Sequence, residues 1–141
     1  MKTILDVNIL LSALIRDSTT RKIILERLLD LYFPELSLHK IRKYQDYIIE
    51  KSGLTKLEFF ILLRSLLGCI KIIPTEIVHA NWSEAKSIME HIDPEDVTFI
   101  SAALGLGEDT IIWSDDAHFD KQTVIPVLKT KEIVELWYGN K

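Results

Sequence analysis

The sequence predicts an α/β domain whose central parallel β-sheet is flanked by helices on both faces. Short apolar segments that suit buried strands alternate along the chain with longer segments whose apolar residues recur at helical spacing. Strands that alternate with helices form parallel sheets covered on both faces, so this alternation predicts the layered architecture. No repeat or low-complexity linker interrupts it, and we therefore expect one domain over residues 1–141.

Five short segments rich in aliphatic or aromatic residues are the predicted strands. They cover residues 3–5, 32–33, 71–73, 110–113 and 124–128. The segment 110–113 is the clearest buried strand. Proline cannot donate a hydrogen bond to a neighbouring strand, so Pro126 predicts that the segment 124–128 lies at an edge of the sheet.

Seven segments are the predicted helices. They cover residues 8–15, 20–31, 37–51, 55–67, 77–91, 93–105 (or 93–107) and 130–137. Thr55 and Glu58 have the spacing of a capping box, which begins a helix. Asp93 followed by Pro94 is a second strong start signal, because aspartate suits the N-cap and proline suits the first turn. Ser37 is also predicted to be an N-cap.

The composition restricts the classes of function. The formal net charge is −4, whereas proteins that bind nucleic acid through phosphate contacts are usually basic, which argues mildly against such a partner. The single cysteine, Cys69, cannot form an internal disulfide, and no segment is apolar over the roughly 18 residues that a membrane span needs. Asp6 interrupts the apolar core that a signal peptide would require. We therefore expect a cytoplasmic protein with no membrane segment.

Three carboxylates lie where the predicted fold would bring them together. Asp6 follows the strand 3–5, Asp116 closely follows the strand 110–113, and Asp96 lies in the first turn of a helix. Sites in parallel sheets form outside the carboxyl ends of the strands, so these side chains are expected to share one pocket. Magnesium prefers hard oxygen ligands of this kind and can assist attack on a phosphodiester.

Each carboxylate also has a purely structural explanation. Asp6 could cap the helix that begins near Asn8, and Asp116 could cap a turn after its strand. Asp96 could simply stabilise the N-terminus of its helix by roughly 0.3–1 kcal/mol through the helix dipole. The three residues considered together favour a site over these separate explanations.

Three motifs occur in an order that is specific although each motif is weak alone. They are residues 5–13 (LDVNILLSA), 92–97 (IDPEDV) and 113–116 (WSDD). On these motifs the chain resembles the PIN-domain family, which includes the toxins of VapC-type toxin–antitoxin pairs, over nearly its whole length. The resemblance implies a PIN-like fold and a Mg²⁺- or Mn²⁺-dependent endoribonuclease with RNA as its substrate. It also implies that the protein could be a toxin, which would pair with an antitoxin protein and form a homodimer.

The resemblance also implies roles for individual residues. Asp6, Asp96 and Asp116 would be the catalytic metal ligands. Asn8 and Ser114 would be polar residues that support these ligands, and Asp115 could hold a water molecule in the outer coordination shell of the metal.

A basic cluster implies an RNA contact. Lys40, Arg42 and Lys43 would lie at the mouth of the pocket, where they could bind RNA phosphates or simply form a solvated helix face.

One position departs from the family pattern. Lys40 stands where the family commonly has a glutamate, which would weaken metal binding and reduce activity. Glu35 is a substitute acid that could reach the site. The alternative function is a catalytically degenerate PIN-like module that binds RNA or protein, with the Lys40 ammonium in place of a cation.

Overall fold

The computed structural model describes residues 1–139, and within them a five-stranded sheet has the order β3-β2-β1-β4-β5. Every pair of neighbouring strands is parallel. The strands are β1 (Lys2–Leu5), β2 (Asp30–Pro34), β3 (Lys71–Ile73), β4 (Thr110–Trp113) and β5 (Val127–Leu128). The five predicted strands are confirmed, and β5 lies at the edge that Pro126 predicted.

The order of the strands reverses beside β1. β2 and β3 extend the sheet to one side of β1, and β4 and β5 extend it to the other. Such a switch point leaves a crevice outside the carboxyl ends of the flanking strands. Leu5 pairs with Trp113 in the register of β1 and β4, so Asp6 and Ser114, which follow them, meet at this crevice.

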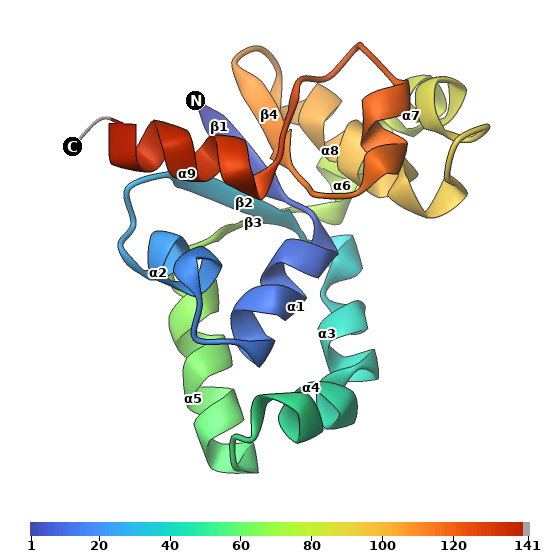
Figure 1. Cartoon of the computed structure of the whole chain (residues 1–141). Coiled ribbons are helices and arrows are strands. Elements are labelled where there is room, and N and C mark those ends of the chain that lie inside the picture. Colours follow the sequence, from blue (N-terminus) through green and yellow to red (C-terminus); the bar gives the residue numbers. More distant parts are fainter. Residues whose placement is uncertain (140–141) are drawn as a thin grey trace.

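Helices flank the sheet in two groups that lie on different sides of it (Figure 1). In the first group, α8 (Val97–Leu106) packs on β1, β2 and β4, and is covered by α6 (Thr75–Ala80) and α7 (Trp82–Met89). The second group contains α1 (Val7–Ile15), α2 (Thr19–Leu25), α5 (Lys56–Leu67) and α9 (Thr130–Gly139).

The shorter elements complete the chain. They are α3 (His39–Lys43), α4 (Gln45–Ser52) and the 3-10 turns η1 (Glu35–Ser37), η2 (Pro94–Asp96) and η3 (Ala117–Lys121). None of the helices within residues 1–139 combines the length and the apolar character that crossing a bilayer requires.

Two predicted helix starts are confirmed in atomic detail. The Thr55 hydroxyl accepts a hydrogen bond from the Glu58 N–H at 3.1 Å, and the Glu58 carboxylate accepts one from the Thr55 N–H at 2.9 Å. The Asp93 carboxylate accepts a hydrogen bond from the Glu95 N–H at 3.0 Å. At the other end of α8, Gly107 is the C-cap with a φ of 85°, which glycine adopts without steric cost.

The predicted helix over residues 20–31 is wrong in its second half. α2 ends at Leu25, and Arg27 has a φ of 57°, which a right-handed helix cannot accommodate. Leu28 is 57% exposed, whereas Leu31 is buried in β2. The helical spacing of these leucines therefore arose from residues of two different elements.

Two other predicted helices are each split in two. The segment 37–51 contains α3 and α4, which meet at Tyr44, and Ser37 is buried in η1 instead of capping a helix. The segment 77–91 contains α6 and α7, which meet at Asn81. Tyr44 (φ −99°, ψ 9°) and Asn81 (φ −115°, ψ 11°) leave helical geometry, and the chain bends there.

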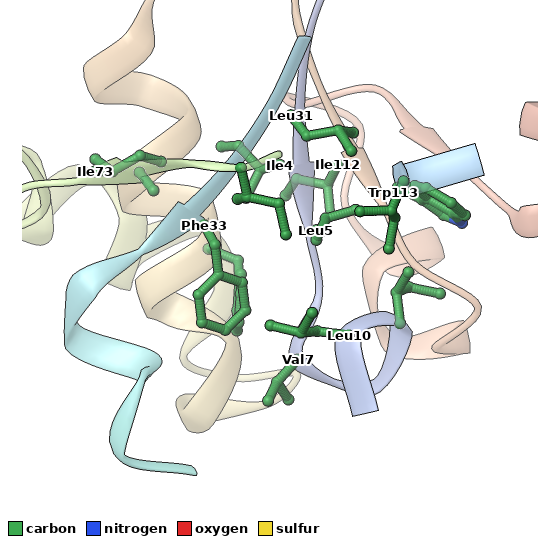
Figure 2. Close-up of a cluster of buried hydrophobic side chains, with 14 of the residues drawn as sticks. Ile4, Leu5, Val7, Leu10, Leu31, Phe33, Ile73, Ile112 and Trp113 are labelled. Atoms are coloured by element: carbon green, nitrogen blue, oxygen red, sulfur yellow. The ribbon is translucent and has the colours of Figure 1, made fainter. Parts of the chain in front are cut away.

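The strand ends near the crevice are anchored in the hydrophobic core (Figure 2). Figure 2 shows buried side chains of β1, β2, β3 and β4 beside those of α1, namely Ile4, Leu5, Leu31, Phe33, Ile73, Ile112, Trp113, Val7 and Leu10. Interiors are close-packed, so these side chains hold the strands in fixed positions. The polar residues that directly follow β1 and β4 are positioned with them.

Candidate active site and metal centre

A pocket of about 500 Å³ opens at the carboxyl ends of β1 and β4. Asp6, Asp96 and Asp116 all line it, although they come from three segments far apart in the sequence. The structure therefore brings together the three carboxylates that the sequence predicted to converge.

Asp6 is held by the register of the two central strands. Its carboxylate Oδ2 accepts a hydrogen bond from the Ser114 hydroxyl at 2.8 Å, and its backbone N–H donates to the Trp113 carbonyl at 3.0 Å. The side chain is buried. Burial raises the pKa of Asp6 above its ordinary value, the bond from Ser114 acts in the opposite direction, and the charge of Asp116 raises it further.

Ser114 also fixes the position of Asp116. The Ser114 Oγ accepts a hydrogen bond from the Asp116 N–H at 3.0 Å, and Asp116 Oδ1 accepts one from the His118 N–H at 2.9 Å. Asp116 therefore does cap the turn η3, as its structural explanation proposed. That bond accounts for one carboxylate oxygen only, and the same side chain still lines the pocket.

Asp96 is the least compensated of the three carboxylates. It is the last residue of η2 and the N-cap of α8, but its side chain makes no capping hydrogen bond. The residue is only 7% exposed, and its Oδ2 atom is buried without a hydrogen-bond partner. Burial, followed by the negative charges of Asp93 and Asp6, raises the pKa of Asp96 to about 8.

Asp93 and His118 also join this site, although neither is among the metal ligands that the sequence predicted. The Asp93 carboxylate caps η2 with Oδ1, while its Oδ2 lies 3.1 Å from His118 Nδ1. His118 Nδ1 also lies 3.5 Å from Asp116 Oδ1. Burial acts to raise the pKa of Asp93, but hydrogen bonds from the Glu95 N–H and from His118 hold it below its ordinary value. The sequence explained Asp93 as an N-cap, and this explanation did not predict its contact with His118.

The predicted supporting residues divide between the pocket and other contacts. Asn8 is exposed and lines the pocket. Glu35 lies away from the lining residues, and its carboxylate accepts a hydrogen bond from the Thr75 hydroxyl at 3.2 Å.

Asp115 points to the C-terminal helix. Its carboxylate oxygens accept hydrogen bonds from the Thr130 N–H at 2.8 Å and the Thr130 hydroxyl at 2.7 Å. The Thr130 Oγ in turn accepts a hydrogen bond from the Trp113 indole at 2.9 Å. Asp115 therefore attaches the first residue of α9 to the end of β4.

The basic cluster contributes two of its three members to the pocket wall. Lys40 and Lys43 line it, with Tyr44 and Tyr47, whereas Arg42 is exposed outside the lining. Among the carboxylates of residues 1–139, none forms an ion pair with Lys40 within 4.0 Å. The ammonium therefore forms no ion pair that bridges the acids, which is the contact that would have supported the degenerate module.

The residues present fit a divalent cation. Asp93, Asp96, Asp116 and His118 can each offer one ligand atom, and these atoms lie within 4.8 Å of one another. Asp96 supplies an unpartnered buried oxygen, and the pKa values of Asp6 and Asp96 are raised first by burial and then by the negative charge of neighbouring carboxylates. A cation would remove that repulsion, and carboxylate oxygen is the ligand that Mg²⁺ and Mn²⁺ accept most readily.

Comparison with known proteins gives one match. A family model described as PIN domain matches residues 4–136. A search of curated proteins returned no match. The matched range contains every residue of the pocket described above.

Proposed function

Because this chain belongs to the PIN-domain family, whose members are in general metal-dependent nucleases, we propose that it is a Mg²⁺- or Mn²⁺-dependent endoribonuclease. The observation that carries the proposal is the convergence of Asp6, Asp96 and Asp116 on one pocket, with an oxygen of Asp96 buried and unpartnered. A carboxylate in that state is costly unless a positive charge lies beside it.

The residues of the pocket divide the work. Asp6, Asp96 and Asp116 would hold the cation, and Ser114 fixes the relative positions of Asp6 and Asp116 through its one hydroxyl. When bound, the cation supplies Lewis-acid stabilisation of the charge that develops on a phosphodiester during in-line attack by water. The hydrogen-bonded carboxylates provide a preorganised geometry for that attack.

Substrate RNA would lie along the wall that α3 and α4 form. Lys43 Nζ lies 5.4 Å from the centre of the Tyr44 ring, and Lys51 Nζ lies 5.8 Å from that of Tyr47. Aromatic rings bordered by lysines suit unpaired bases and phosphates. This local positive charge offsets the objection that the formal net charge of −4 raised against a nucleic-acid partner.

The toxin role is a further part of the proposal. Leu57, Phe60 and Ile61 on α5 are exposed by 70%, 43% and 58%. An exposed apolar face of this kind suits the homodimer and antitoxin contacts that related toxins make. Such a toxin would act in the cytoplasm. Light scattering of the purified chain, alone and co-expressed with the protein encoded beside its gene, tests both contacts. A monomer that captures no such protein would contradict them.

The nuclease proposal is tested by RNA cleavage. The purified chain is incubated with structured and unpaired RNAs in Mg²⁺ or Mn²⁺, beside Asp6→Asn, Asp96→Asn and Asp116→Asn variants. Asp120→Asn is the matched control, because Asp120 is exposed and pairs with Lys129 away from the pocket. We expect the three pocket variants to lose cleavage and the control to retain it. Cleavage that survives in all three variants would refute the proposal.

A further inference from the structure

We propose that His118 and Asp93 complete the cation site with Asp96 and Asp116, and that the imidazole nitrogen makes this chain prefer Mn²⁺ to Mg²⁺. The inference rests on the proposed function in one respect, which is that the pocket is a cation site. It adds two ligands that come from this chain's own geometry, and one of them is not an oxygen.

The spacing of the four residues suits one ion. Their candidate ligand atoms all lie within 4.8 Å of one another. Ligands on opposite sides of a small divalent ion are separated by twice the bond length, which is roughly 4–5 Å, and adjacent ligands lie closer. His118 Nδ1 already lies 3.1 Å from Asp93 Oδ2 and 3.5 Å from Asp116 Oδ1.

A separate observation points to a ligand at this position. Asp96 is only 7% exposed, lines the pocket, and keeps one oxygen without any hydrogen-bond partner. Buried polar atoms in folded proteins are nearly always partnered by protein, water or an ion. The candidate ligand atoms of Asp93, Asp116 and His118 lie within 4.8 Å of one from this carboxylate.

Asp93 also replaces the charge that Lys40 removes. With Asp93 included, four carboxylates border the pocket even though the usual glutamate position holds a lysine, namely Asp6, Asp93, Asp96 and Asp116. Asp6 is not one of the four residues of the proposed site, but its charge interacts with those of Asp96 and Asp116, which are.

The imidazole determines the predicted metal preference. Mg²⁺ strongly favours oxygen ligands, whereas nitrogen ligands suit the first-row transition metals. In this site the imidazole of His118 adds one nitrogen donor, a softer ligand than carboxylate oxygen, to the carboxylates. The nitrogen donor favours Mn²⁺ relative to Mg²⁺.

The test measures binding by calorimetry and ligation by pulsed EPR on the full chain with Mn²⁺. We expect Mn²⁺ to bind about tenfold more tightly than Mg²⁺ and to show coupling to one imidazole nitrogen. In His118→Gln the coupling disappears and Mn²⁺ affinity falls by about tenfold or more, whereas Mg²⁺ affinity changes much less. His79→Gln is the matched control, because His79 is an exposed histidine on α6 outside the pocket.

A second variant tests Asp93 without removing its cap. Asparagine is also a good N-cap, so Asp93→Asn keeps η2 while removing one ligand charge, and it should lower the affinity for both ions. Mn²⁺ that binds without nitrogen coupling would overturn this inference and leave the nuclease proposal intact. A chain that binds neither ion would overturn both.

Discussion

Replacement of Asp96 by asparagine should remove the main pH dependence of the stability of the metal-free protein. The pKa of Asp96 is raised from 3.8 to about 8, so between these values the folded chain holds a proton that the unfolded chain releases. The free energy of unfolding must therefore fall as pH rises through this window. The contribution of Asp96 is complete below pH 3.8 and is lost by about pH 8.

The size of the effect follows from the shift. One pKa unit corresponds to about 1.36 kcal/mol, so the full shift sets a ceiling of roughly 5–6 kcal/mol. Water that enters the open pocket relieves part of the repulsion, and we expect a loss of about 2 kcal/mol between about pH 4 and pH 8. The asparagine side chain is neutral at every pH. Asp96→Asn should therefore match the wild type near pH 4 and exceed its stability near pH 8.

Urea denaturation in the presence of EDTA, at several pH values, measures this difference. Asp120→Asn is again the control, because Asp120 lies on the surface and its replacement should leave the slope unchanged. Added Mn²⁺ should reverse the order at pH 8, since the wild type binds it and the variant has lost a ligand. A stability difference between the wild type and Asp96→Asn that stays constant with pH would refute the reasoning.

Three other changes have defined outcomes. Ser114→Ala removes the hydroxyl that lowers the pKa of Asp6, so calorimetry should show roughly tenfold weaker Mn²⁺ binding near neutral pH. Lys40→Glu should raise Mg²⁺ affinity several-fold in the same assay, and no change would mean that Lys40 does not face the cation. Gly105→Ala should destabilise the fold by about 1–3 kcal/mol in urea, because a Cβ there would overlap Ile77 on α6, which outweighs the gain of about 1 kcal/mol in helix propensity. A stabilised Gly105→Ala variant would contradict this close packing.

Helices and strands were predicted correctly where the apolar pattern lay within a single element. β3 has the predicted limits, and the capping box of Thr55 starts α5 as expected. The errors share one cause, which is that apolar spacing continues across a break. Arg27, Tyr44 and Asn81 interrupt helices through their backbone angles, and tertiary packing, not residue type, decides those angles.

The part of the candidate site that lies at the ends of the strands was predictable from the sequence. Asp6 and Asp116 follow strands whose register brings them to one crevice, and this could be inferred from the sequence. Asp93 and His118 depend on how η2 and η3 turn toward each other, because they lie 25 residues apart and meet side chain to side chain. Periodicity carries no information about such a contact.

The hydrogen bonds around Thr130 attach α9 to the end of the sheet at which the acidic pocket opens. Trp113 and Asp115 stand on either side of Ser114, and both bind the first residue of α9. Loss of α9 would remove these side-chain contacts from the residues on either side of Ser114, while the bonds of Ser114 to Asp6 and Asp116 would remain. A change at Thr130 would thus reach the neighbours of the acidic pocket although Thr130 itself does not line that pocket.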